Sequence, residues 1–487
     1  MLNSIYLLLP EVVTIVMACF ILVVDLFVVE KSKNFIYTLT QATIIVVFVL
    51  FLYNNTSLDK NSFFVYENSF VFDKFNNYLK IIITFFTFFI FAYVQRYITN
   101  NNVKEGDYYS LCLFSLLGMF LLVSSGNLLM FYLSIELMSL PLYTLIAMMN
   151  NYSTSQESAF KYFILGSVAS SLILFGISLV YGMVGSVLFT DIFTYLSSCY
   201  DNDSNLILQS GCFLVIIGLV FKLGVAPFHV WVPDVYKGSA VPVTILISTI
   251  PKIAVFGIFL KLLSTVFFPL YLKFLPLLII MSVLSLFIGN VFALAQTNIK
   301  KLFAYSSISH IGFVILGLVS LQECSSVSVS LFYLFIYVIT TLGSFSLLLV
   351  FCKDASRELE NLSDLKGFAL TNPFIAFFLS IFLFSMAGIP PLVGFYAKLL
   401  VLNNVVSVGL LWLAIFSVLM TVVGLFYYLR VVKVMYFDSA EDSSCVYTIT
   451  MSKFGVVLIS LNSFIILLLG VYPYPVLWLC SFICSGN

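Results

Sequence analysis

Charged residues are scarce in this sequence. Only 9% of the 487 residues are charged, whereas 62% are hydrophobic and the mean hydropathy is +1.12. A soluble domain of this length could not bury so much apolar surface, so the composition excludes a water-soluble protein. The 22 basic and 22 acidic residues balance each other, and without a basic excess we expect no nucleic-acid partner.

Metal-binding and redox motifs are also lacking. The sequence has two histidines and nine scattered cysteines, with neither a CxxC pair nor a Cys/His cluster. Zinc sites, haem attachment and iron–sulfur clusters require such clusters. We therefore expect no metal and no cofactor in this chain, and any electron carriers should belong to other proteins.

Apolar runs of helical length fill the rest of the chain. Read in order they give about 14 spans of roughly 20 residues, so the predicted class is an all-α polytopic membrane protein. The first 30 residues contain no lysine or arginine, which argues against a cleaved signal peptide and for a retained first helix. We expect Glu11 and Asp25 near the two ends of that helix, without a transport role. The last span is expected over 454–482.

Lysine and arginine near the span ends gather on one side of the membrane. The odd-numbered connections hold 14 of them and the even-numbered connections hold 5, Lys80 and Lys261 included. By the positive-inside rule both chain termini then face away from the cytoplasm or matrix. Three lysines remain, and they fall inside apolar spans.

These three lysines are Lys222, Lys252 and Lys398. A charge at bilayer depth costs roughly 2.5–3.5 kcal/mol on insertion scales, so such residues usually face a protein interior or a water-filled path. Two of the spans also carry a Gly-x-x-Pro sequence, at 224–227 and 388–391, which predicts broken helices 7 and 12. Buried ionisable groups on broken helices are typical of ion pathways, and we interpret the chain as a proton or cation translocator.

The two breaks also align with each other. Gly224 matches Gly388 and Pro227 matches Pro391, five helices later. Because five is odd, the two units would have opposite orientations in the membrane. The sequence therefore predicts an inverted repeat.

Glu136 is the acid that stands alone in its span, and Lys222 stands alone in the seventh. A buried carboxylate needs a neighbouring base, so we expect the two side chains to be partners, in transport or as a static ion pair. His229 follows the first break and could relay protons or be a structural residue at a helix end. His310, in YSSISHIGF, has the same two interpretations. Lys398 could also reach the surface, because few apolar residues follow it.

Several segments resemble a known family. FYLSIELMSLPLYTLIAM, FKLGVAPFHVWVPDVYKG, IPKIAVF, ALAQTNIKKLFAYSSISHIGF and MAGIPPLVGFYAKL are similar to the antiporter-like subunits of proton-pumping NADH:ubiquinone oxidoreductase, respiratory complex I, and most of all to the N type. The resemblance implies a proton path of six residues: Glu136, Lys222, His229, Lys252, His310 and Lys398. Of these, His310 has the least settled part in the family.

The same resemblance implies the fold and the surroundings of the chain. We expect 14 helices with two inverted five-helix repeats, divided into helices 1–3 (1–105), a first repeat of helices 4–8 (106–265), a second repeat of helices 9–13 (266–436) and helix 14 (437–487). Electron transfer would occur in other subunits, so flavin, iron–sulfur clusters and quinone are expected there. Expected partners are other membrane-arm subunits, a neighbouring antiporter-like subunit among them, and lipids. The expected location is the mitochondrial inner membrane, with the bacterial cytoplasmic membrane as the alternative.

Two other functions compete with this interpretation. A subunit of a multi-subunit cation/proton antiporter shares the same motifs and would exchange sodium for protons without NADH. A structural membrane subunit would tolerate neutral replacements of the three lysines. A solute transporter is the least favoured, because no polar cluster suggests a substrate pocket.

Overall fold

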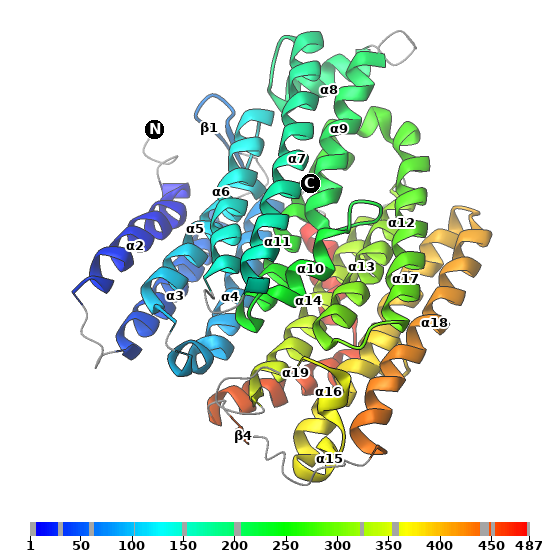
Figure 1. The fold of residues 1–487 in the computed structure, drawn as a ribbon. Coiled ribbons are helices and arrows are strands. Elements are labelled where there is room, and N and C mark those ends of the chain that lie inside the picture. Colours follow the sequence, from blue (N-terminus) through cyan, green and yellow to red (C-terminus); the bar gives the residue numbers. More distant parts are fainter. Residues whose placement is uncertain are drawn as a thin grey trace.

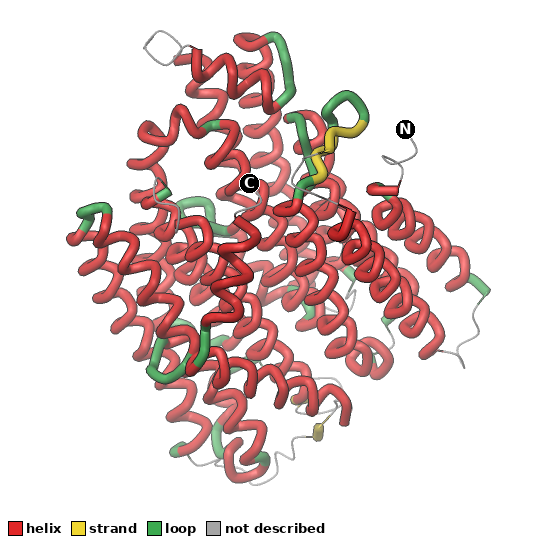
Figure 2. The backbone as a smooth tube through the Cα atoms, turned by 180° about the vertical axis from the view of Figure 1, so that it is seen from behind, coloured by secondary structure: helices red, strands yellow, loops and turns green. Residues whose placement is uncertain are grey.

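A computed structural model describes residues 6–27, 33–57, 63–101, 103–148, 153–198, 206–321, 326–352, 360–438, 448–449 and 453–484. Helices make up nearly all of this part of the chain (Figures 1 and 2). The α-helices are α2 (Leu9–Asp25), α3 (Lys33–Ser57), α4 (Lys74–Asn100), α5 (Glu105–Val123), α6 (Leu128–Ala147), α7 (Ser153–Val184), α8 (Phe189–Ser198), α9 (Leu206–Leu223), α10 (Trp231–Gly238), α11 (Val241–Lys261), α12 (Tyr271–Leu294), α13 (Ile299–Leu316), α14 (Ser326–Val350), α15 (Phe368–Thr371), α16 (Pro373–Ala387), α17 (Val393–Ser407), α18 (Leu411–Tyr436), α19 (Lys453–Val471) and α20 (Tyr474–Cys484).

The few strands lie in connections. The strands β1 (Phe63–Val65) and β2 (Phe70–Phe72) form one antiparallel pair, and β3 (Phe351–Cys352) and β4 (Thr448–Ile449) form another. In Figure 1, β1 and α8 lie at the upper end of the molecule, whereas α15 and β4 lie at the lower end. The two ends correspond to the even- and odd-numbered connections of the sequence.

The lengths of the helices confirm the all-α polytopic membrane class. Among the described residues 11 helices are long and apolar enough to cross a membrane, or 12 if the bent pair α19 and α20 counts as one span. Two further apolar helices, α16 and α17, are shorter. The count of 14 spans and the inverted repeat remain predictions.

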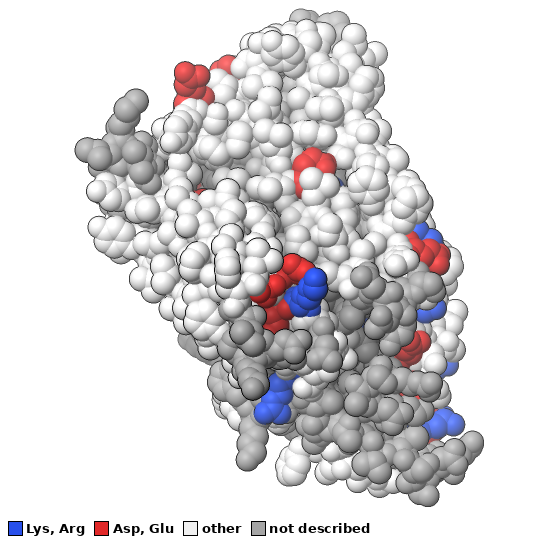
Figure 3. Space-filling model, turned by 60° about the vertical axis from the view of Figure 1, so that its left-hand side comes forward, with Lys and Arg blue, Asp and Glu red and all other residues white. Residues whose placement is uncertain are grey.

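The outer surface suits a lipid environment. Large apolar side chains of α18 stand exposed along its length, such as Trp412, Leu419 and Phe426. On the face shown in Figure 3, charged side chains form only a few small groups on a largely uncharged surface. Such an apolar exterior is stable in a bilayer and would aggregate in water.

Helix α11 forms the centre of the molecule. All 21 of its residues are buried, and it packs against α4, α5, α9 and α14. A helix that is apolar around its whole circumference belongs in a core rather than at a surface. Its charged residue Lys252 is therefore surrounded by protein on every side.

The structure departs from the sequence expectations in two details. The final span is bent by 83° between α19 and α20, where Pro473 lies in the break. Two lysines that were counted with the connections are also buried. The reason is that α4 begins before its apolar run in the sequence, and that α11 continues beyond its apolar run as a π-helix over Leu262–Val266. Lys80 forms an ion pair with Glu11 in which both side chains are buried, and Lys261 is buried as well. Lys31, Lys60, Lys353 and Arg357, which the count of basic residues included, lie outside the described residues.

Candidate functional site

The first predicted break is present, and glycine explains how it forms. Helix α9 ends at Leu223, and Gly224 takes the left-handed conformation with φ of +75°. The amide of Gly224 donates to Phe221 O (2.9 Å) and the amide of Val225 donates to Val220 O (3.2 Å). This pair of bonds is the Schellman stop that glycine favours at a helix C-terminus. Pro227 lacks an amide hydrogen, and the chain resumes as α10 only at Trp231.

The second break repeats the first. Helix α16 ends at Ala387, and Gly388 has a φ of +84°. The amides of Gly388 and Ile389 both donate to carbonyls of the last helical turn, including Phe384 O at 3.0 and 3.1 Å. Helix α17 then begins at Val393. The prediction that helices 7 and 12 are broken is thus confirmed at both positions.

Lys222 lies at the end of α9, next to the first break. Its side chain is 5% exposed, and its Nζ donates to Tyr143 Oη on α6 at 3.2 Å. The expected ion pair with Glu136 is not formed: no ion pair between described residues joins the two side chains. Tyr143 and Glu136 are seven residues apart on one face of α6, so Lys222 reaches this face about two turns from the carboxylate.

Glu136 forms no ion pair with any described residue. One of its carboxylate oxygens is buried and has no hydrogen-bond partner among the described residues. Leu133 and Leu140, one turn before and after it, are about half exposed, at 50% and 51%. The face of α6 that carries Glu136 therefore borders the surface of this chain.

Lys252 lies at the middle of the buried helix α11. It is 2% exposed, and its Nζ donates to Tyr337 Oη of α14 at 2.9 Å. The ring of Tyr337 is also 4.9 Å from the ammonium, close enough for a cation–π contact. The Tyr337 hydroxyl in turn donates to Ser248 O at 3.1 Å. Tyr337 is thus the hydrogen-bond partner of the buried charge, and the ring of Tyr236 lies 5.9 Å from the same ammonium.

His310 on α13 sits next to this tyrosine. Its ring lies 5.7 Å from that of Tyr337, and its two nitrogens hydrogen-bond the hydroxyls of Tyr333 (2.9 Å) and Tyr428 (3.2 Å). A neutral imidazole donates from one nitrogen and accepts at the other, so the ring can pass a proton between two hydroxyls. Both ring nitrogens of His310 thus have hydroxyl partners, whereas its part in proton transfer stays a prediction.

Lys398 on α17 is held by the second break. It is 9% exposed, and its Nζ donates to Met386 O (2.8 Å) and Ala387 O (3.0 Å), carbonyls that the end of α16 leaves without an intrahelical partner. A small cavity lined by His310, Tyr337, Met386 and neighbouring residues lies between the histidine and this helix end. Lys398 is therefore buried in this chain and does not reach the surface.

His229 is placed apart from these groups. It follows the first break, between the exposed residues Pro227 and Val230, and its Nδ1 has no hydrogen-bond partner among the described residues. No described hydrogen bond joins it to Lys222 or Lys252. The structure thus places His310 within electrostatic range of both Lys252 and Lys398, and it leaves His229 and Glu136 nearer the periphery.

The sequence interpretation missed the tyrosines. Tyr143, Tyr337, Tyr333 and Tyr428 supply the hydroxyls that contact Lys222, Lys252 and His310. A phenol in an apolar span needs a hydrogen-bond partner, so a tyrosine within such a run is a usable signal. With 28 tyrosines and 52 phenylalanines in the chain, this signal is weak until the helices are packed.

The region that contains the candidate site residues matches a known protein family. The profile described as NADH:quinone oxidoreductase/Mrp antiporter, TM, matches residues 125–424, which include all six candidate site residues. NADH-quinone oxidoreductase subunit N of Thioalkalivibrio sulfidiphilus (strain HL-EbGR7) is 40% identical over 464 residues, with 95% of both chains covered. The subunit N of Hydrogenovibrio crunogenus is 40% identical over 471 residues, with 97% of both chains covered.

The chain belongs to the NADH:quinone oxidoreductase/Mrp antiporter family. Solved structures show the fold of this family in more than one assembly. A chain of respiratory complex I from Thermus thermophilus has a TM-score of 0.77 at 24% identity and covers 96% of this chain and 98% of its own length. A chain of the Mrp complex from Dietzia sp. has a TM-score of 0.81 at 19% identity, covering 98% and 97%. The antiporter-like fold by itself therefore does not separate the two functions.

Proposed function

We propose that this chain is a proton-translocating membrane-arm subunit of an NADH:quinone oxidoreductase. The fold is common to both assemblies and does not discriminate between the two functions. The sequence identity of 40% to bacterial NADH-quinone oxidoreductase subunits N, over nearly the whole chain, supports this assignment over the sodium/proton antiporter. The observation that carries the proton-transfer role is the Lys252–Tyr337 hydrogen bond beside His310, deep inside the helix bundle. A buried cation with hydroxyl and imidazole neighbours can gain and lose a proton along hydrogen bonds.

The path begins where the chain meets its neighbour. Glu136 lies near the surface of α6, and Lys222 contacts Tyr143 on the same face. A change of charge or position in an adjoining subunit would alter the field at Glu136 and with it the tendency of Lys222 to hold a proton. Redox chemistry would occur in other subunits, so this chain moves only protons.

The path continues through the centre and ends at the second break. Tyr162 lies within electrostatic reach of Tyr143 and Tyr236, which extends the row of phenols from Lys222 towards Lys252. Lys252 then passes its proton to Tyr337 as the Tyr337 hydroxyl turns its own proton from Ser248 O towards His310, and the cavity beyond leads to Lys398. We place His229 beside this path as an access residue at the first break. The division into helices 1–3, two inverted five-helix repeats and helix 14 is part of this proposal.

The surroundings follow from the assignment. Neighbouring membrane-arm subunits, another antiporter-like subunit among them, and lipids would cover the apolar exterior. The relatives reported above are bacterial, which favours the bacterial cytoplasmic membrane, the alternative weighed from the sequence. The mitochondrial inner membrane stays a prediction without support from these comparisons.

The decisive experiment replaces Lys252 in the assembled complex. We expect Lys252→Met to lower the number of protons pumped per NADH oxidised in proteoliposomes. Lys252→Arg keeps the charge but releases no proton at physiological pH, so it should fail in the same way. Rescue by arginine would make the buried charge structural, and an unchanged ratio in both variants would overturn the path. Lys273→Met, at an exposed lysine of α12, is the matched control.

A second measurement addresses the antiporter. Proteoliposomes without NADH would be given a sodium gradient, and internal pH would be followed. We expect no sodium-driven proton movement. Exchange that requires Lys252 would instead favour an Mrp-type function for this chain.

A further inference from the structure

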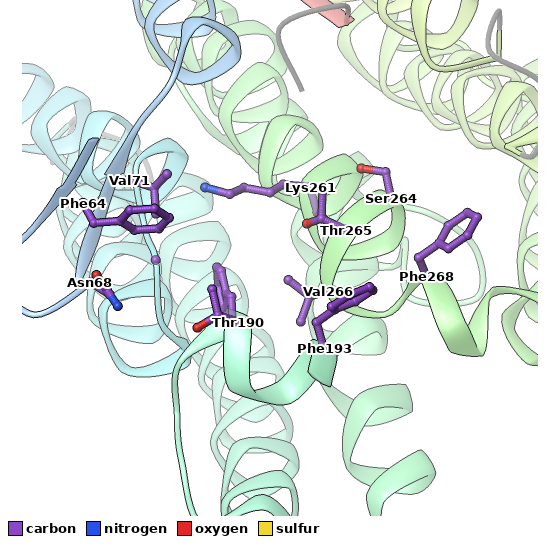
Figure 4. Close-up of a pocket in the computed structure, with 12 residues that line it drawn as sticks. Phe64, Asn68, Val71, Thr190, Phe193, Lys261, Ser264, Thr265, Val266 and Phe268 are labelled. Atoms are coloured by element: carbon purple, nitrogen blue, oxygen red, sulfur yellow. The ribbon is translucent and has the colours of Figure 1, made fainter. Parts of the chain in front are cut away.

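A further buried charge lies outside the proton path, beside a cavity of about 440 Å³ (Figure 4). The cavity forms where β1, α8 and the π-helical end of α11 meet. Four phenylalanines line it: Phe64, Phe189, Phe193 and Phe268. Three of them are partly exposed, at 41–50%, so the cavity opens to the exterior. Its volume falls in the range of ligand pockets, and its walls are mainly apolar.

Lys261 is the charged residue of this cavity. Its side chain is 7% exposed, and Figure 4 shows it extending from the end of α11 towards Phe64 and Val71. Its Nζ donates to Ser125 O at 3.1 Å, which is its one hydrogen bond within the described residues. An ammonium group has three donors, so two are left for a ligand. The Ser264 hydroxyl, on the same segment, is also buried without a described partner.

The nearby charges do not satisfy Lys261. Asp73 lies within electrostatic range, but no described ion pair joins the two side chains. The Asp73 carboxylate caps α4, where it accepts from the backbone amide (2.6 Å) and the side-chain amide (3.1 Å) of Asn76. The partial positive charge of a helix N-terminus already compensates such a carboxylate. Lys80, the other nearby cation, is paired with Glu11.

A ligand must therefore combine a negative charge with an apolar body. A small hydrophilic anion would lose its hydration against phenylalanine walls without compensation. A membrane lipid brings both parts, and basic residues near a bilayer surface attract anionic headgroups. The cavity also lies at the end of the molecule that carries β1 and α8, opposite α15 and β4 (Figure 1), so it opens towards one leaflet.

We propose that this cavity binds an anionic phospholipid, with its phosphate at Lys261 and an acyl chain along the four phenylalanines. Ser264, on the π-helical segment that follows Lys261, also lines the cavity. Lys252 lies nine residues before Lys261, roughly 14 Å along α11, so the lipid holds the outer end of the helix that carries the central lysine. The site is independent of the proton path and is tested without NADH.

The test uses a tryptophan reporter at the cavity. The full chain carrying Phe193→Trp is titrated in mixed micelles with brominated-acyl phosphatidylglycerol or brominated-acyl phosphatidylcholine, and quenching is corrected for the three native tryptophans with the parent chain. We expect half-quenching at a several-fold lower mole fraction of phosphatidylglycerol. Phe426→Trp, on an exposed face of α18, is the control and should show no preference.

The role of Lys261 is tested on the same reporter. Lys261→Met should abolish the preference for phosphatidylglycerol, and Lys261→Arg should retain it. Equal quenching by both lipids with Lys261 intact would overturn the proposal even if the methionine variant failed to fold. A preference that survives in Lys261→Met would overturn the assignment of the phosphate to this lysine.

Discussion

The two helix breaks end alike but hold their lysines differently. Helices α9 and α16 both stop at a left-handed glycine with equivalent capping hydrogen bonds. Lys222 precedes its glycine by two residues and relies on a hydroxyl of another helix, Tyr143 on α6. Lys398 follows its glycine by ten residues and donates to the carbonyls that the break itself sets free.

This difference separates two ways of keeping a charge in a membrane. Backbone carbonyls are part of the fold, so the partners of Lys398 persist for as long as α16 ends at Gly388. The partner of Lys222 is one side chain on a helix that also carries Glu136, and a small shift of α6 would change it. The first break therefore suits a site that responds to its neighbours, and the second suits a fixed site at the end of a path.

The largest effect is expected from removing either charge. Lys222→Met and Lys398→Met should each abolish most proton pumping in the assembled complex, because either change interrupts the row of proton carriers. Protons pumped per NADH oxidised is the quantity to measure, with assembly checked by subunit content. If one variant pumps at the parental ratio, its break is structural and the comparison fails.

The glycines provide the next test. Alanine in a left-handed conformation costs about 1–2 kcal/mol, so Gly224→Ala and Gly388→Ala should both lower the stability of the complex to heat. An added Cβ at Gly388 would meet the Lys398 side chain at 3.0 Å, whereas at Gly224 it would meet Val232 at 2.6 Å. Only Gly388→Ala should therefore also reduce pumping in proportion to assembled complex. Equal pumping by both variants would contradict the idea that the Met386 and Ala387 carbonyls at the second break hold Lys398 in place.

Tyr143→Phe tests the dependence of Lys222 on a side chain. Loss of a hydrogen bond to a charged group costs roughly 1.5–3 kcal/mol, and we expect partial loss of pumping without loss of assembly. Tyr181→Phe, at a tyrosine of α7 that is 53% exposed, is the control for removal of a hydroxyl. Full pumping by Tyr143→Phe would show that Lys222 has another partner in the complex.

The smallest effect is expected at the surface of the first break. Asp234 stands ten residues after Gly224, the position that Lys398 holds after Gly388. It pairs with Lys161 (3.1 Å) and with Lys301 (3.6 Å), and the Lys161 side chain is 43% exposed. Exposed pairs are worth about 0–1 kcal/mol, so Lys161→Met should shift thermal stability only slightly and less at high salt. A shift as large as that of Gly224→Ala would show that the pair is buried in the complex.

Much of the fold was predictable because the bilayer restricts the choices. Apolar runs of span length, the Gly-x-x-Pro sequences and lysines within apolar runs have few structural solutions in a membrane. The broken helices at Gly224 and Gly388 and the burial of Lys252 followed from those features and are present. The bend between α19 and α20 was missed, because hydropathy measures length and composition and carries no information on direction.

Which side chains contact one another could not be predicted in the same way. The sequence paired Lys222 with Glu136, but packing placed it against Tyr143 on the same face of α6. It also counted Lys80 among the connections, although helix α4 buries it against Glu11, 69 residues away along the chain. Which groups meet depends on helix register and rotation, and these are set by contacts between helices distant in sequence.

The sequence by itself determined that this chain crosses a membrane many times, breaks two of its helices and keeps charges in the apolar interior. These features are local, because hydrophobicity, glycine conformation and the missing amide of proline act within a few residues. Only the tertiary structure decided that tyrosine hydroxyls accept hydrogen bonds from Lys222 and Lys252. It also decided that Lys398 donates to the carbonyls at the second break and that Lys261 faces an apolar cavity. Such contacts join helices far apart in the chain, and their geometry exists only once the helices have packed.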